Sequence, residues 1–149
     1  MSEVIQPVDF DRDTGYFFQA AREGRLVYRA CKSCGGGIHL PTQFCGRCGS
    51  NDTEWRQASG NGTLFSWTTV TQGVHPAYPA PYTIVVVALD EAPEVRLIGA
   101  IPGAVGLQAG QPMRVCFDER TREFGLPQWR PVEVRGPCSD TSVNEPVRR

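Results

Sequence analysis

Two short stretches, Cys31-Lys32-Ser33-Cys34-Gly35 and Cys45-Gly46-Arg47-Cys48-Gly49, decide the fold of the amino-terminal part of this chain. In each stretch two residues separate the cysteines, so the backbone turns back and both sulfurs face one point. The glycine that follows can adopt the turn conformation that other residues resist. Two such knuckles supply four thiolates, the ligand set of a tetrahedral zinc ion. We therefore predict a structural zinc site with four protein ligands and no open position, made by Cys31, Cys34, Cys45 and Cys48.

Other states of the four cysteines are a pair of disulfides, free thiols, or an iron ion in the same cage. The first residues, MSEVIQPVDF, lack the basic-then-apolar order of a signal peptide. We therefore expect a soluble, cytoplasmic protein in which disulfides are rare. No apolar run approaches the roughly 20 residues that span a bilayer, so no membrane contact is expected. His39 lies between the knuckles and is interpreted as a solvated residue, with a spare metal ligand as the alternative.

Composition and charge limit the function classes. The chain has 149 residues, 40% of them hydrophobic and 21% charged, which suits one ordinary domain with a small metal-held unit. It carries 15 basic and 16 acidic residues, a formal net charge of -1. Zinc bound by four thiolates would make the protein more acidic still. Because phosphate neutralisation supplies most sequence-independent nucleic-acid affinity, this balance argues against a nucleic-acid partner.

A short helix is predicted from Asp13-Thr14, as its cap, to about Glu23, with Gly24 as the stop. Its adjacent aromatic residues Tyr16, Phe17 and Phe18 cannot all face one side of a helix. At least one must face outward. The helix is therefore either packed between two parts of the protein or in contact with a partner.

The rest of the pattern predicts strands. Short strands at 25–30 and 38–40 flank the first knuckle, and turn residues at 59–62 mark a junction. We predict a helical segment at 1–24, a zinc ribbon at 25–58, a barrel at 59–134 and a polar tail at 135–149. Turn signals separate five further strands, which suggests a small barrel: 63–70, 82–89, 95–101 with a bend at Gly99, 113–117 and 129–134.

Strand 82–89 is apolar on both faces. One face belongs to the barrel core, so the other must be covered by the helix and ribbon or by another chain. The connection 73–81 before it contains three prolines and is predicted to be a stiff, projecting contact element. Met113, Val115 and Phe117 alternate toward one face of their strand, so Cys116 points to the other face. It is interpreted as a buried or half-buried structural thiol.

These features together resemble one family. The aromatic helix, the Cys31-Cys34/Cys45-Cys48 ribbon, the Ser59-Gly60-Asn61-Gly62 turn, the Pro81-Tyr82 entry to an apolar strand and Gly110–Phe117 are similar to the zinc-ribbon plus OB-fold family of acyl-CoA-associated proteins. The likeness covers roughly residues 9–132. It implies a mainly β fold with an N-terminal helix, a rubredoxin-like zinc ribbon and a five-stranded OB-fold barrel.

The resemblance also implies a role. Such proteins are small, non-catalytic partners of thiolase-superfamily enzymes that carry out acyl transfer, Claisen condensation or retro-aldol cleavage, including the shortening of steroid side chains. They bridge subunits or help to hold a CoA thioester. The sequence shows no nucleophile–base pair, so no catalytic residue is predicted. Candidate contacts with the partner or with acyl-CoA are Tyr16, Phe17, Phe18, His75, Tyr78 and Tyr82.

Two other functions stay open. OB-fold barrels often bind single-stranded nucleic acid on aromatic rings, and Phe65, Trp67, Tyr78 and Tyr82 could supply such rings. The near-neutral charge opposes this alternative. An iron-loaded electron carrier is the third possibility, and its red colour would distinguish it from a colourless zinc protein.

Overall fold

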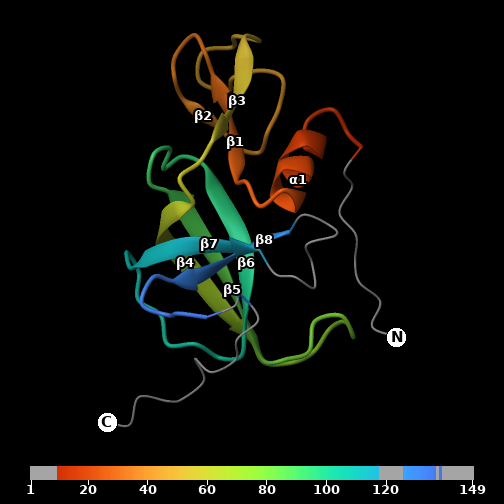
Figure 1. Ribbon diagram of the computed structural model, residues 1–149, viewed down its shortest axis with the longest axis vertical. Helices are drawn as coiled ribbons and strands as arrows, with labels where there is room; N and C mark the ends of the chain where they lie inside the picture. The colour runs from red at the N-terminus through yellow and green to blue at the C-terminus, as the bar shows by residue number, and fades with distance from the viewer. Residues whose placement is uncertain (1–9, 118–125, 137, 139–149) are drawn as a thin grey trace.

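The computed structural model describes residues 10–117, 126–136 and 138. The fold is mainly β, as predicted. One short helix precedes two antiparallel sheets, a small sheet with the order β2-β1-β3 and a larger one with the order β6-β5-β4-β7-β8. The small sheet stands at one end of the molecule, with the helix beside it and the larger sheet below (Figure 1).

Helix α1 spans Gly15–Arg22. Thr14 occupies the N-cap position, but its side chain makes no capping bond. The Asp11 carboxylate instead caps the turn that leads into the helix. Its Oδ1 accepts hydrogen bonds from the backbone N–H groups of Asp13 at 2.8 Å and Thr14 at 2.7 Å. Gly24 ends the helix as predicted, with a φ of 74° that favours glycine.

The small sheet comprises β1 (Val27–Cys31), β2 (Gly37–Ile38) and β3 (Thr53–Gln57). Strand β1 is central, and Arg29 on it is paired with Ile38 on one side and Trp55 on the other. The expected strands at 25–30 and 38–40 are therefore present with shifted bounds. Strand β3 was not predicted, because its only large apolar side chain is Trp55 and its other residues are polar.

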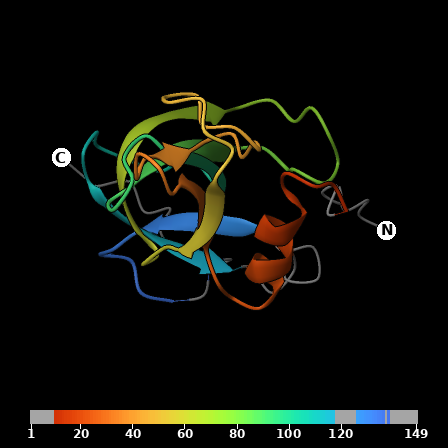
Figure 2. The ribbon, with the colours of Figure 1, turned by 90° about the horizontal axis from the view of Figure 1, so that it is seen from above.

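The larger sheet comprises β4 (Asn61–Val70), β5 (Tyr82–Leu89), β6 (Arg96–Pro102), β7 (Pro112–Phe117) and β8 (Pro127–Pro131). All five predicted barrel strands exist, although the last begins and ends earlier than expected. Strand β4 pairs with β7 through Asn61–Thr63 and with β5 along most of its length. It therefore curves strongly around the barrel (Figure 2). The barrel division at residue 59 stays a prediction.

Strands β6 and β8 close the barrel. The backbone N–H of Ala100 donates to Gln128 Oε1 at 2.6 Å. A Cβ atom on Gly99 would lie only 2.9 Å from Trp129 Cδ1, so glycine permits the close approach of the two strands. The bend predicted at Gly99 is not made by a bulge, because β6 pairs regularly with β5 through this residue. The irregularity instead falls on β4, between Leu64 and Ser66.

The two faces of β5 differ in burial. Thr83, Val85, Val87 and Leu89 are almost fully buried in the barrel core. The alternating residues Ile84, Val86 and Ala88 are only half-buried on the outside. Ile98, which is paired with Val86, is 68% exposed. Among the described residues, the helix and ribbon therefore leave the outer face of β5 and β6 partly uncovered.

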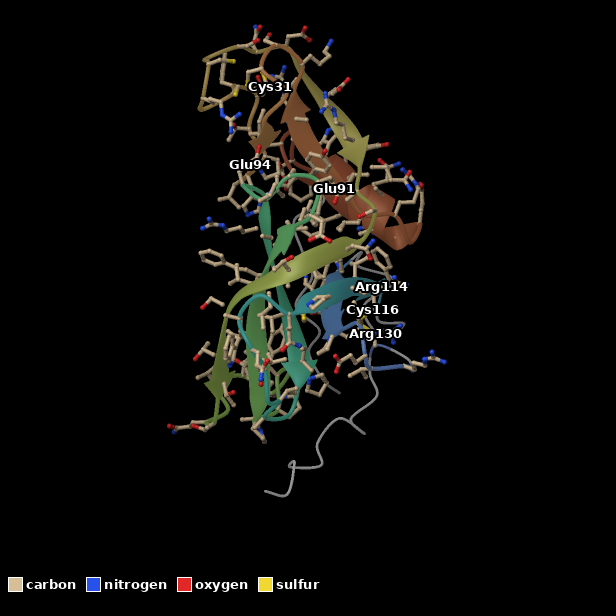
Figure 3. The ribbon with its side chains drawn as sticks, turned by 90° about the vertical axis from the view of Figure 1, so that its left-hand side faces the viewer. Cys31, Glu91, Glu94, Arg114, Cys116 and Arg130 are labelled. Atoms are coloured by element: carbon tan, nitrogen blue, oxygen red, sulfur yellow. A yellow bond between two sulfur atoms is a disulfide. The ribbon has the colours of Figure 1, made fainter. Side chains whose placement is uncertain are left out.

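The ribbon joins the barrel through tight contacts. Leu26, Tyr28 and Ala30 belong to the same buried cluster as Leu64 and Trp129 of the barrel. Gly37 lies against the loop between β5 and β6, where a Cβ would come within 2.6 Å of Val95 Cγ2. Figure 3 shows Glu91 and Glu94 between Cys31 at one end and the barrel strands that carry Arg114, Cys116 and Arg130.

The interpretation of Cys116 as a thiol was wrong. Cys116 is buried as expected, but it forms a disulfide with Cys138, 22 residues further along the chain. The side of β7 that carries Cys116 thereby anchors the start of the predicted tail. Residues 139–149 of that tail lie outside the described part of the chain. Among the residues that are described, no helix combines the length and the apolar character needed to cross a membrane.

Candidate metal centre and contact residues

The two cysteine knuckles have the same local structure. Gly35 N–H donates to Cys31 O at 2.9 Å, and Gly49 N–H donates to Cys45 O at 2.8 Å. Both glycines have a φ of 74°, which a residue with a Cβ rarely adopts. The repeated turn brings each second sulfur back beside the first. The sequence prediction for these two turns is confirmed in detail.

The four sulfurs converge on one point. All lie within 4.8 Å of one another, and the pairs Cys31–Cys48 and Cys34–Cys45 are 3.6 Å apart. A tetrahedron with zinc–sulfur bonds of about 2.3 Å has edges of about 3.8 Å. The donor set and its spacing therefore fit a four-coordinate zinc ion. The structure does not place them as disulfides, because all four cysteines are free.

The thiols differ in how readily they ionise. A hydrogen bond from the backbone N–H of Cys34 lowers the pKa of Cys31 to about 6. The pKa of Cys45 is also lowered, first by the backbone N–H of Cys48. The backbone N–H of Ser50 acts to lower the pKa of Cys48, but the neighbouring sulfurs outweigh it and raise that pKa to about 11. The cluster therefore accommodates some negative charge unaided and needs a cation to hold four thiolates.

The metal cluster, as far as the described residues go, consists of the four cysteines alone. His39 is not part of it; the residue as a whole is exposed, but burial lowers the pKa of its imidazole. Cys31 and Cys45 are buried with Ile38 in a small apolar cluster, whereas Cys34 and Cys48 are exposed. A metal bound here would be buried on one side and close to the surface on the other.

The aromatic residues of α1 point in different directions. Tyr16 is 41% exposed and contacts Trp55 of β3, with ring centroids 5.5 Å apart. Phe17 packs against the barrel core and also contacts Phe18 edge-on. The helix is thus packed between ribbon and barrel, one of the two predicted arrangements. A contact of these residues with a partner stays a prediction. Trp55 was missed by sequence reasoning because its strand was missed.

The remaining candidates gather on and beside the proline-rich connection before β5. His75 and Tyr78 form an isolated bridge, and His75 Nδ1 accepts a hydrogen bond from Ala77 N–H at 3.1 Å. The ring of Tyr78 lies 6.0 Å from that of Tyr82. These three residues are brought together at a place remote in sequence from α1. Their predicted contact with a partner or with acyl-CoA is not tested by this arrangement.

Comparison with protein families identifies both parts of the chain. Residues 18–54 match the family model described as the rubredoxin-like zinc ribbon domain of ChsH2. Residues 55–118 match the model of the C-terminal OB-fold domain of ChsH2. The boundary between the two models falls within β3.

Individual relatives extend this finding. The chain is 32% identical over 124 residues to a probable enoyl-CoA hydratase alpha subunit of Thermomonospora curvata. The matched region covers 82% of this chain but only 38% of that relative. A solved structure titled Ltp2-ChsH2(DUF35) aldolase is 31% identical, with a TM-score of 0.74, over 84% of this chain and 98% of that one. A DUF35 protein of unknown function from Sulfolobus solfataricus, 14% identical with a TM-score of 0.54 over 67% of this chain and 74% of that one, shares the fold.

Proposed function

Because this chain belongs to the ChsH2 family of zinc-ribbon and OB-fold proteins, we propose that it is a non-catalytic, acyl-CoA-binding scaffold subunit of a complex with a thiolase-superfamily enzyme. The observation that carries the proposal is the likeness to a chain of the Ltp2-ChsH2(DUF35) aldolase, of which 98% is covered. The likeness to an aldolase favours retro-aldol cleavage over acyl transfer or Claisen condensation as the reaction served. The large subunit would supply the catalytic groups.

The open outer face of the barrel supports a protein partner. Ile84, Val86 and Ile98 lie side by side on β5 and β6, and Phe65 is 52% exposed at the irregular point of β4. Arg96 covers Phe65 with its guanidinium carbon 3.8 Å from the ring centroid. An apolar surface rimmed by a cation is typical of an interface rather than of a free surface.

The metal has a structural part in this proposal. Zinc at Cys31, Cys34, Cys45 and Cys48 would hold the ribbon in place and take no part in the chemistry. The aromatic residues of α1, together with His75, Tyr78 and Tyr82, are proposed contacts with the partner or with the CoA thioester. Metal analysis and colour decide between a colourless zinc protein and a red iron protein.

Co-expression with a candidate thiolase-superfamily partner tests the proposal. We expect a complex that survives size exclusion and acyl-CoA turnover that needs both chains. Ile98→Asp should weaken the complex by at least tenfold, because a carboxylate would be buried in an apolar interface. Val132→Asp, a matched change at a residue 45% exposed on another part of the surface, should leave it unchanged. Full turnover by the large subunit alone, without any complex, would refute the proposal.

A further inference from the structure

An apolar cavity of about 140 Å³ lies between α1, the ribbon and the start of β6. The helix provides Phe17 and Phe18, the ribbon provides Ile38 and Trp55, and the barrel provides Leu97. In Figure 1 these three parts meet where α1 lies beside β1. An enclosed cavity of about 150 Å³ with an aliphatic and aromatic lining binds a six-carbon ring. This one opens to solvent, since its lining residue Leu40 is 72% exposed. The cavity therefore has the size and chemistry for a hydrocarbon group of about six carbons.

Two basic side chains stand in this wall, His39 and Arg29, and burial lowers the pKa of His39, so Arg29 carries the lasting positive charge. Arg29 lies in the middle of the small sheet, paired with Ile38 and Trp55, and all three line the cavity. Its Nε donates to Thr53 Oγ1 at 3.0 Å, and its guanidinium carbon lies 5.4 Å from the centroid of the Trp55 ring. No carboxylate within the described residues forms an ion pair with it. Within the described part of the chain, no hydrogen bond to its terminal nitrogens accompanies the one made by Nε.

This arrangement differs from the other arginines of the ribbon. Arg25 pairs with Glu23, and Arg56 pairs with Glu54 at 2.7 Å. Both of those residues are half-buried, as Arg29 is, but their charge is compensated by a carboxylate. Arg29 is half-buried beside apolar groups without such a partner, and a partly desolvated cation gains most from an anion. The guanidinium fork matches the two oxygens of a carboxylate.

We infer that this cavity binds a short aliphatic carboxylate of about six carbons, with its chain among Phe17, Ile38 and Leu97 and its carboxylate on Arg29. This binding site is separate from the cysteine cluster and does not require a partner chain. It goes beyond the proposed function, which concerns the holding of a CoA thioester within a complex. In a thioester of the same acyl chain the acyl carbonyl is uncharged, so it would not compensate Arg29 at the position of the carboxylate.

Calorimetric titration of the zinc-loaded full chain with hexanoate tests the inference. For a ligand of this size we expect a dissociation constant of about 1 mM or lower. Acetate should bind about a hundredfold more weakly, because it lacks four methylene groups that the cavity would cover. Hexan-1-ol and hexanoyl-CoA should each bind at least fivefold more weakly than hexanoate. Equal binding of hexan-1-ol or tighter binding of hexanoyl-CoA would overturn the inference.

Variants locate the bound carboxylate. Arg29→Leu should weaken hexanoate binding at least tenfold, and Arg29→Lys should weaken it less. Arg114→Leu is the matched control, because Arg114 is an exposed arginine on β7 and lies outside the cavity. It should leave binding within twofold of the unchanged protein. Nuclear magnetic resonance should show hexanoate shifting the Arg29 Nε–H and Trp55 indole signals, which keeps the test valid if a variant is unstable.

The outcome separates this inference from the proposed function. Hexanoate binding without any complex with a thiolase-superfamily protein would support the cavity inference and count against the proposed function. A complex that forms and turns over acyl-CoA, while neither hexanoate nor Arg29→Leu has any effect, would overturn the inference alone. If Arg29→Leu loses the complex and the free chain does not bind hexanoate, the cavity would be assigned to a side chain of the partner. That result would also overturn the cavity inference.

Discussion

The ribbon and the barrel are small β structures that are stabilised in different ways. The barrel encloses a continuous apolar core that includes Leu64, Val85, Met113 and Trp129, all nearly inaccessible to water. The outer half of the ribbon has only Cys31, Ile38 and Cys45 in its buried cluster. Such a cluster is too small to offset the loss of chain entropy on folding. Bonds between the cysteines and a metal ion therefore have to stabilise that end of the molecule in place of an apolar core.

The inner half of the ribbon follows the barrel instead. Tyr28 and Ala30 on β1 belong to the barrel core, while Cys31 at the end of the same strand belongs to the metal cluster. The change from one kind of stabilisation to the other thus occurs within one residue step. This difference predicts that the two regions respond separately to metal removal and to core substitutions.

Metal removal should have the largest effect. Structural zinc sites contribute about 10 kcal/mol or more to the folding of small domains. Cys31→Ser, or a strong chelator, should abolish metal binding and unfold residues 31–52, while strands β4–β8 keep their structure. Metal analysis and residue-resolved nuclear magnetic resonance measure both parts. Cys116→Ser should retain the metal as a control. An outer ribbon that stays folded without metal would contradict the difference in stabilisation between the ribbon and the barrel.

A substitution in the barrel core should have the opposite effect: it should destabilise the barrel and leave metal binding intact. Trp129 is 1% exposed, so Trp129→Ala should lower the free energy of unfolding by about 4 kcal/mol through lost burial and the cavity left behind. Metal stoichiometry should be retained. Trp67→Ala, at a residue 37% exposed, should cost much less. Denaturant unfolding measures both, and a similar loss for the two variants would show that the barrel core is not organised as described.

The disulfide should have an intermediate effect on the barrel and none on the ribbon. Closing a loop between residues separated by 22 positions stabilises the folded state by about 3 kcal/mol in the chain-entropy model. Replacing both Cys116 and Cys138 by serine should lower the melting temperature without loss of metal. Thiol labelling of the unreduced protein should detect neither cysteine. Rapid labelling of both would mean that they are not joined in solution.

Sequence reasoning succeeded where a local pattern carried the information. The CxxCG repeats identify the metal cluster because each knuckle is formed by five consecutive residues. The continuous apolar run through Ile84 and Val87 placed β5 and showed that both of its faces are apolar. The disulfide was missed because its second member lies in a polar segment with no pattern to link it to β7. The role of Gly99 was misjudged because its contact with Trp129 is set by barrel closure.

The cavity could not be predicted from the sequence for the same reason. Phe17 and Phe18 were singled out as aromatic neighbours, but their common space with Trp55 and Leu97 depends on how three separate elements meet. The sequence did not distinguish Arg29 from Arg25 and Arg47, since arginines near the ribbon suit an anion or a solvated face equally. Only the pairing of β1 with β2 and β3 places it between two apolar side chains.

The smallest predicted effect concerns the junction that couples the two regions. Glu94 Oε1, on the barrel side, accepts a hydrogen bond from the ribbon residue Gly37 at 2.6 Å. The pKa of Glu94 is held below its usual value, first by its own backbone N–H, then by Gly37 N–H and the charge of Arg47. Because the pKa is lower in the folded state, the stabilisation is fully present above about pH 4.5 and is lost as the pH falls through the folded pKa.

Glu94→Gln should therefore lower the melting temperature slightly at neutral pH and make no difference in acid. The comparison with the unchanged protein at each pH cancels the loss of metal caused by protonation of the thiolates. Glu91→Gln is the control, because the Glu91 carboxylate accepts from Ser59 at the entry to the barrel. Only Glu94→Gln should speed hydrogen exchange at Gly37 N–H. A melting difference that grows as the pH falls would show that this bond does not couple the ribbon to the barrel.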